Sequence, residues 1–451
     1  MPILKSSPQK KKSLVRRYIF STIFYGTIFV LIGIIILFIF SDSLLNNFAK
    51  EKIITSFAEK YPNYTLQVGH IQYDVWKNRI GCDSLSIQTK DTSFSCTLIS
   101  PSLTGINWIK LFMEKDFSSH VNGEMKEAKF IFPSSYYELR FHNLRISVPD
   151  SSLSAEEFHY QPFVDDNTFF SLNKFRITRM RIAVPQIAIA GFNYTALLQN
   201  TAYYARSVSG KNASFDFLLN KEKPIDSLSP SPVMPKEALS SIKTPLQCDS
   251  VKISNAFFRY REEFKKNSTP ATVTFDTTQM VVTGITNNFK ENDTLFIHAQ
   301  TKFLNSSTMK LTLTMPLALP EFSFHYSGSL ERIPFTKINP FLEIAEPVRI
   351  KSGTLHKATY TITVNKGYAI GKIRGIYDNL SFALLDEKTR SEKGFSNSII
   401  SFFVNTFKIR QDNLPDDLKT GTIKYQKKKE ETFIQFIWYA LRGGMQDVVG
   451  F

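Results

Sequence analysis

Residues 64–76, YTLQVGHIQYDVW, decide the fold of this chain. Apolar side chains occupy every second position on each side of Gly69, namely Leu66 and Val68 before it and Ile71, Tyr73 and Val75 after it. Successive side chains of a β-strand point to opposite faces, so a period of two indicates strands that are apolar on one face and polar on the other. A glycine inside such a pattern is typical of a β-bulge. The stretch therefore predicts half-buried β-structure.

The same period of two continues along most of the chain after this stretch. Clear examples are Leu144–Val148, Met180–Val184, Leu295–Ala299, Met309–Met315, Phe322–Tyr326 and Tyr360–Val364. We expect a mainly β protein with one long antiparallel sheet of roughly 18–22 strands and a few short helices at its N- and C-terminal ends. At ~4.8 Å between strands the sheet would be roughly 90–100 Å wide, and its twist would curl it into a groove.

The apolar side of each strand would face the inside of this groove. The positions that this pattern selects as groove lining are Val68, Ile71, Phe141, Ile146, Val148, Ile177, Ile182, Val184, Phe275, Val282, Leu311, Leu313, Phe322, Phe324, Ile362 and Val364. Little helical pattern lies between residues 63 and 395, so few helices are available to cover the sheet. The inner surface is therefore predicted to suit phospholipid acyl chains as partners.

Before the first strand, residues 18–40 form an apolar run without a charged residue. As a helix it would be roughly 34 Å long, enough to cross a hydrocarbon core of ~30 Å. A basic segment, residues 1–17, precedes it and carries Lys5, Lys10, Lys11, Lys12, Arg16 and Arg17. The positive-inside rule predicts a cytoplasmic N-terminus, a single transmembrane helix and a chain that continues on the far side of the membrane. A cleaved signal peptide is the alternative, but the run is long for one.

The formal net charge is +15. Because several of these charges belong to the N-terminal segment and the rest are scattered, we expect no nucleic-acid partner, and attraction to an anionic membrane surface fits the basic composition better. Three cysteines, Cys82, Cys96 and Cys248, are too few for a disulfide framework. Cys82 and Cys96 could form one disulfide in an oxidising compartment, and burial as small apolar residues is the alternative.

A proline- and serine-rich segment, residues 220–246, interrupts the strand pattern and reads as a linker or loop. It separates a first β-rich groove region, residues 41–219, from a second one, residues 247–394. The last part, residues 395–451, has two helical patterns, at 395–407 and 430–441. In the second, the candidates for a membrane-interface contact are Phe433, Phe436, Ile437 and Trp438. The alternative is that this helix caps the sheet.

No pattern in the sequence indicates catalysis, so we expect no enzyme, no cofactor and no metal. The seven histidines lie singly, without the pairs that hold a metal ion. Neither Gly210-Lys211 nor Gly371-Lys372 has the flanking residues of a phosphate-binding loop. Adjacent acids such as Asp165-Asp166 point to opposite sides of a strand or lie in turns.

The run SLERIPFTKINPFLEIAEPVRIKSGTLHKATYTITV from Ser329, together with one N-terminal anchor and the strand pair VGHIQYDVWKNRIGCDSLSI, resembles the AsmA-like proteins of Gram-negative envelopes. The residues that carry the resemblance are Ile338-Asn339-Pro340-Phe341, Val348, Ile350, Ser352-Gly353 and Leu355. It implies an inner-membrane-anchored periplasmic protein with a repeating β-groove, linked to phospholipid transport between inner and outer membrane and to outer-membrane homeostasis. Further candidate partners are the inner membrane and periplasmic or outer-membrane proteins. An assembly factor for outer-membrane proteins, which would bind clients by strand addition, is the second hypothesis, and an anchored hydrolase is a remote third.

Overall fold

The computed structural model describes Ile28 and residues 43–108, 110, 113, 120–226, 228, 230–319, 322–386 and 410–450. The predicted cytoplasmic segment and the predicted transmembrane helix lie outside the described residues except for Ile28, and the predicted helix at 395–407 lies outside them entirely. Within the described ranges, no helix combines the length and the apolar character that crossing a bilayer requires.

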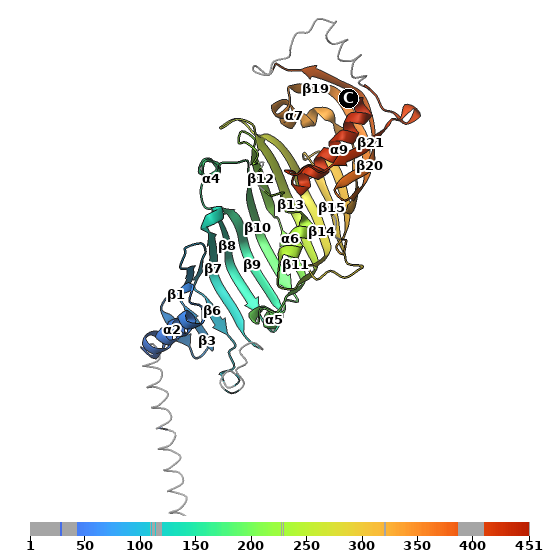
Figure 1. Ribbon diagram of the computed structural model, residues 1–451. Helices are drawn as coiled ribbons and strands as arrows, with labels where there is room; N and C mark the ends of the chain where they lie inside the picture. Colours follow the sequence, from blue (N-terminus) through green and yellow to red (C-terminus); the bar gives the residue numbers. More distant parts are fainter. Residues whose placement is uncertain are drawn as a thin grey trace, which may run out of the picture.

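The described chain is mainly β, as predicted, and its strands belong to one long sheet (Figure 1). The strands are β1 (Tyr64–Val68), β2 (Ile71–Asp74), β3 (Arg79–Cys82), β4 (Ser84–Thr89), β5 (Ser95–Ile99), β6 (Ser102–Thr104), β7 (Asn122–Phe132), β8 (Tyr137–Ser147), β9 (Ser152–Pro162), β10 (Thr178–Ala190), β11 (Tyr203–Lys211), β12 (Ser214–Asn220), β13 (Leu246–Glu263), β14 (Ala271–Thr286), β15 (Thr294–Phe303), β16 (Ser307–Pro316), β17 (Phe324–Leu330), β18 (Ile333–Pro334), β19 (Val348–Asn365), β20 (Tyr368–Leu384) and β21 (Thr420–Gln426).

Short helices occur in the connections as well as at the two ends. They are η1 (Leu44–Ala49), α2 (Lys50–Lys60), η2 (Pro133–Ser135), α4 (Asp166–Leu172), α5 (Tyr194–Leu198), α6 (Pro235–Ser241), η3 (Phe335–Ile338), α7 (Asn339–Ala345), η4 (Pro415–Asp417) and α9 (Phe433–Val449). The prediction of helices only at the ends therefore needs correction, because α4, α5, α6 and α7 interrupt the run of strands. Each is only five to seven residues long, too short to produce a clear helical period.

Most neighbouring strands are antiparallel, but β13 pairs in parallel with both β11 and β12. The prediction of a wholly antiparallel sheet was wrong at this point, and the sheet is mixed. The reason is the connection 221–245: a parallel neighbour must be reached by a crossover over one face of the sheet, not by a hairpin. The proline-rich segment provides this crossover and contains α6. The sheet itself continues across it without interruption through the β12–β13 pairing.

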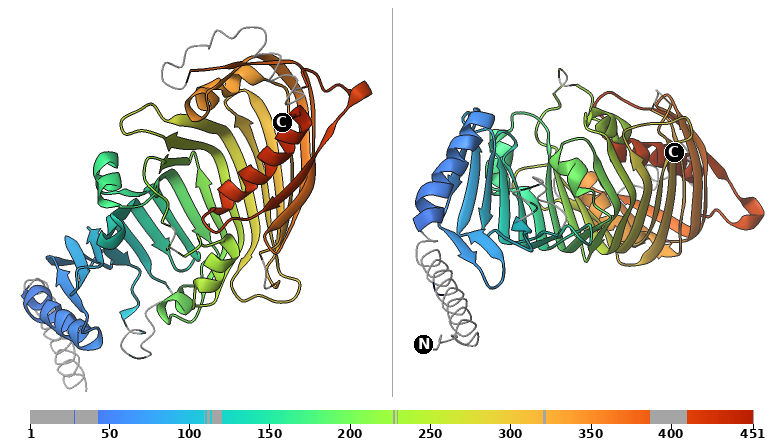
Figure 2. Two further views of the ribbon diagram at one scale, coloured as in Figure 1. Left: turned by 45° about the horizontal axis from the view of Figure 1, so that its top comes forward. Right: turned by 90° about the horizontal axis from the view of Figure 1, so that it is seen from below.

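Left-handed backbone conformations occur at one level of the sheet, in four strands and in the connection between β11 and β12. Asn143, Glu157, Asn212, Asn255 and Thr277 have φ angles of 46°, 54°, 54°, 54° and 48°. The strand registers place Glu157 and Asn212 on either side of Pro185, and Asn255 donates a 2.7 Å hydrogen bond to the Oδ1 of Asn212. Left-handed residues interrupt the regular pleat, so each strand bends here. Figure 2 shows that the sheet as a whole is twisted and curved.

Helix α9 lies on one face of the curved sheet near its C-terminal end, and we call this the inner face (Figures 1 and 2). Thr432 caps the start of the helix, its hydroxyl accepting a hydrogen bond from the Gln435 backbone, and Gly450, with φ 96°, caps its end. Phe436 and Ala440 of α9 are completely buried, and they pack in one cluster with Ile362 of β19. This cluster is the largest apolar core of the described chain.

Candidate functional site

A continuous row of apolar residues follows the inner face from the α9 core to the N-terminal half of the sheet. The registers place directly opposite one another, from strand to strand, Leu313, Ile297, Val282, Val251, Val208, Ile189, Leu153 and Ile146. Residues directly opposite in neighbouring strands point to the same face. The inner face is therefore apolar over eight strands, from β16 to β8.

Two apolar clusters on this face have no helix packed on them among the described residues. One is centred on Ala128, Leu144 and Ala155, and the other on Val184, Ala213 and Ala256. The partly buried residues that pack against them all belong to strands of the same sheet. By contrast, residues of α9, α7 and α6 pack in the large C-terminal core, and residues of α4 pack in a cluster with Tyr137. A sheet normally buries its apolar face against a second layer, and the described chain supplies none here.

Phenylalanine rings line these clusters, and two more, Phe275 and Phe303, continue the line toward the C-terminal core, in which Phe303 packs. We call the aromatic strip the set of half-buried residues Phe130, Phe141, Phe158, Phe215, Phe258, Phe275 and Phe303. Ring centroids lie 6.4 Å apart for Phe130 and Phe141 and 5.0 Å apart for Phe141 and Phe158. The rings of Phe215 and Phe258 are stacked at 4.2 Å, and those of Phe275 and Phe303 are 5.6 Å apart. Such contacts fix the rings in place while leaving part of each exposed.

The predicted groove-lining residues fall into three groups. Those that are half-buried in the structure are Phe141, Ile146, Val148, Ile177, Ile182, Phe275, Val282, Leu311 and Phe322. Three more, Val68, Ile71 and Val184, are buried within the sheet. Phe141 and Ile182 lie in the two clusters without a covering helix, whereas Ile177 packs in the cluster that contains α4.

The remaining four, Leu313, Phe324, Ile362 and Val364, cannot contact a bound ligand in this structure. All four are at most 2% exposed in the core that α9 covers, and the ring of Phe324 lies 5.3 Å from that of Phe433. Their assignment as groove lining is therefore corrected. The chain fills this end of the inner face with its own helix, because the apolar side of α9 matches the apolar side of the strands.

The four predicted membrane-interface residues lie on different sides of α9. Phe436 is completely buried, and Phe433 and Ile437 pack against the same core, so these three contact the sheet. For them the interface assignment is corrected in favour of the cap. Trp438 points away from the core and is exposed, as is Ile434 one turn earlier.

A cluster of charges lies on the outer face of β10, β12 and β13. Arg179 is completely buried and donates to the Oδ2 of Asp216 at 2.8 Å, and Arg261 donates to the same oxygen at 2.7 Å. Arg259 donates to the Oδ1 at 2.9 Å. Burial raises the pKa of Asp216, but the three arginines outweigh it and lower that pKa to about 2. Arg179 also donates to the Oδ2 of Asp166 at the start of α4 at 3.1 Å, so the cluster fastens this helix to the sheet.

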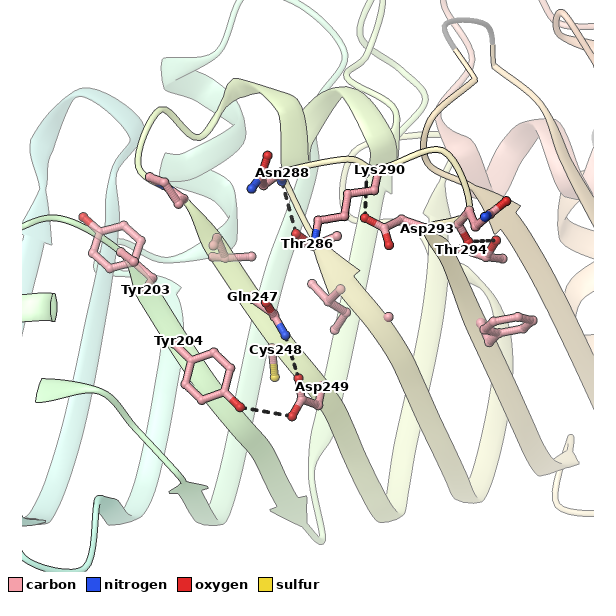
Figure 3. A pocket seen from close by; sticks show the side chains of 17 residues that line it. Tyr203, Tyr204, Gln247, Cys248, Asp249, Thr286, Asn288, Lys290, Asp293 and Thr294 are labelled. Atoms are coloured by element: carbon pink, nitrogen blue, oxygen red, sulfur yellow. Dashed lines mark hydrogen bonds between the residues drawn. The ribbon is translucent and has the colours of Figure 1, made fainter.

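A pocket of about 570 Å³ lies where β11, β13, β14 and β15 end (Figure 3). Asp249 accepts hydrogen bonds from Tyr204 and Gln247 at 3.3 and 3.1 Å, and Asp293 accepts one from the backbone of Lys290 at 2.8 Å. These carboxylates are thus engaged in holding the strand ends together. Cys248 also lines the pocket, and burial raises the pKa of its thiol, which makes it a poor nucleophile.

In the part of the chain that the structure describes, no three His, Cys, Asp or Glu side chains are grouped as a metal site requires. The three cysteines are unpaired. The inner-face surface is therefore the candidate functional site, and what it offers chemically is apolar contact.

Sequence reasoning did not select Phe130, Phe158, Phe215, Phe258 and Phe303 of the aromatic strip. Their signal was present in the count of 40 phenylalanines. Their alignment depends on strand register, which the period of two does not reveal.

Neither the protein-family models nor the curated protein sequences yielded a match to this chain.

Proposed function

We propose that this protein is a membrane-anchored carrier whose inner sheet face shields phospholipid acyl chains between the inner and outer membranes of a Gram-negative envelope. The single observation that carries the proposal is the pair of apolar clusters on which no described helix packs. The uncharged run of residues 18–40 supplies the anchor, and the resemblance to AsmA-like proteins supports the compartment.

Acyl chains match this surface in chemistry and in length. The aromatic strip runs from β7 to β15 across strands that are ~4.8 Å apart, so it offers a path longer than one acyl chain. Moving one CH₂ group from water to an apolar surface gains about 0.8 kcal/mol, whereas moving it from a bilayer to the strip gains almost nothing. A guest would therefore exchange between membrane and protein without being trapped, which is what a carrier requires.

The covered C-terminal end limits where the guest can lie. Because α9 fills the inner face over β17, β19 and β20, the acyl chains would occupy the segment from β7 to about β13. Exposed apolar residues on α9, Ile434 and Trp438, would meet a guest that reaches further.

The test is site-specific photocrosslinking in the full chain, with the probe p-benzoyl-phenylalanine at Phe158 and, as matched control, at the neighbouring His159. Both residues are half-buried on β9, but they point to opposite faces of the sheet. We expect phospholipid adducts from Phe158 and none from His159. A probe at Ile362, beneath α9, should also give none.

Native mass spectrometry of the purified chain provides the second measurement. Wild type should carry phospholipid, and Phe158→Asp should carry much less because a carboxylate is costly against acyl chains. Equal crosslinking from Phe158 and His159, or adducts to outer-membrane proteins in place of lipid, would count against the carrier and in favour of the assembly factor.

A further inference from the structure

The hairpin between β2 and β3 ends in the most exposed tryptophan of the chain. Trp76 is 91% exposed and follows Val75, which is also exposed. Met113, in the segment after β6, is another large apolar side chain with an exposure of 80%. A lone exposed apolar residue is ordinary, but a tryptophan with almost no contacts at a turn is not.

The turn is braced, so the exposure of Trp76 is part of a defined structure. The Lys77 backbone donates to Asp74 at 3.1 Å, and Asn78 donates through its side chain to the Ile106 carbonyl at 2.8 Å. The indole of Trp108 donates to the Oδ1 of Asn78 at 2.9 Å. These bonds hold the backbone on both sides of Trp76 and leave its indole ring free.

The first helix fixes the position of this hairpin. Asn46 of η1 forms two hydrogen bonds with the backbone of Ile71, at 2.7 and 2.9 Å. From Asn46 to the end of α2 the helix rises about 21 Å, and from Tyr64 to Ile71 the strands extend about 23 Å. Because these lengths agree, the chain returns beside the helix, and Figure 1 shows β3 beside α2 at the end of the sheet opposite to α9.

From Ile71 the chain continues in the same direction to Trp76, about 16 Å further along. Ser43, the first described residue of this helix, lies only about 4.5 Å beyond Asn46 in that direction. The turn therefore lies about 12 Å past Ser43, beyond the N-terminal end of η1. The interfacial layer of a bilayer begins within a few residues of the end of a spanning helix.

Other exposed side chains at this end have the same character. Phe48 is 67% exposed, and Leu44 and Ile53 are exposed on η1 and α2. Lysines accompany them at Lys50, Lys52 and Lys77. Tryptophan favours the headgroup layer of a membrane, and lysines near it are attracted to anionic lipids.

We propose that the β2–β3 turn inserts Trp76 into the headgroup layer of the bilayer that holds the anchor. The contact, together with η1, sets the inner face of the sheet at a fixed angle to the membrane surface. The inference rests on the anchor of the proposed function but not on lipid binding by the inner face.

The test uses the full chain in nanodiscs that contain lipid brominated on its acyl chains, which quenches the fluorescence of tryptophans in contact with it. We compare wild type with Trp76→Phe and with the matched control Trp438→Phe, since Trp438 is the other exposed tryptophan. Part of the tryptophan emission that bromine quenches does not depend on lipid bound to the inner face. We expect Trp76→Phe to lose most of this part. That component is isolated in a Phe158→Asp background, in which the inner face carries little lipid.

Acrylamide, a quencher in water, gives the converse measurement. Trp76 should be shielded from acrylamide in nanodiscs. It should be accessible to acrylamide when the chain is kept in solution by an amphipathic polymer, without lipid or detergent. The proposal is overturned if Trp76→Phe leaves the bromine-quenched emission unchanged or if Trp76 is fully accessible to acrylamide in nanodiscs. If the inner face of wild type binds no lipid but bromine still quenches Trp76, the carrier function is refuted and the proposed membrane contact of Trp76 is retained.

Discussion

Two adjacent glycines of α9 predict opposite effects of the same substitution. A Cβ atom added at Gly444 would lie 2.8 Å from Cγ2 of Ile373 and closer still to Ile423. Both isoleucines are buried in the sheet beneath α9. At Gly443 the same atom would have nothing within 4 Å. Gly444→Ala should therefore push α9 away from the sheet, whereas Gly443→Ala should not.

The magnitudes follow from two terms. Replacing glycine by alanine inside a helix stabilises it by about 1 kcal/mol, and this gain applies at both positions. Forcing a methyl group into a filled core costs about 1–3 kcal/mol, and this cost applies only at Gly444. Subtracting one variant from the other removes the helix term, so Gly444→Ala should be less stable than Gly443→Ala by about 1–3 kcal/mol.

Hydrogen exchange of the α9 backbone amides in the full chain measures this difference directly. The exchange rates of the two variants should differ by about 5- to 150-fold, because each 1.4 kcal/mol corresponds to a factor of ten. A displaced α9 would also expose Ile362, so a photocrosslinking probe there should begin to capture lipid in Gly444→Ala. Equal exchange rates for the two variants would refute the close packing of α9 on β21.

Two further predictions concern buried groups. Asp216→Asn leaves the buried Arg179 with one carboxylate fewer and should lower the free energy of unfolding by about 2–4 kcal/mol at pH 7 in chemical denaturation, whereas the exposed Asp416→Asn should have little effect. The pKa of Asp216 is lowered from 3.8 to about 2, so its contribution is complete above pH 4 and is lost as the pH falls toward 2; a difference between wild type and Asp216→Asn that stays constant over this range would contradict the assignment. Burial raises the pKa of the Cys96 and Cys248 thiols, so iodoacetamide should label both slowly in the folded chain at pH 8 and rapidly in urea, and equal rates would show that these sites are open.

The sequence predicted what depends on local pattern. The period of two after Tyr64 identified the strands and the long sheet, because alternation along a strand reports burial of one face. It also identified Phe141 and Ile182 as residues of the inner face. The left-handed residues Asn143, Asn212 and Asn255 carried a weaker signal, since asparagine adopts this conformation more readily than other residues.

What the sequence did not predict depends on distant partners. The apolar side of α9 suited a membrane surface as well as a sheet, and only its packing on Tyr326 and Ile362 decides between them. The parallel pairing of β13 likewise follows from the path of the crossover, which no local pattern encodes. The alternation of residues 64–76 predicts Trp76 at the end of a strand, and its position at a braced, exposed turn appears only in the structure.

The parallel junction between β12 and β13 sets an order for assembly of the sheet. A hairpin such as β15–β16 closes over three residues, 304–306, whereas β13 joins β12 only after the 25 residues 221–245 have been placed. The longer loop raises the entropic cost of closure by about 2 kcal/mol. During synthesis, the strands up to β12 can pair as they emerge, and we expect β13 to dock after them. A slow phase in refolding should therefore reflect the pairing of β13 with β12, where the two parts of the sheet would join last.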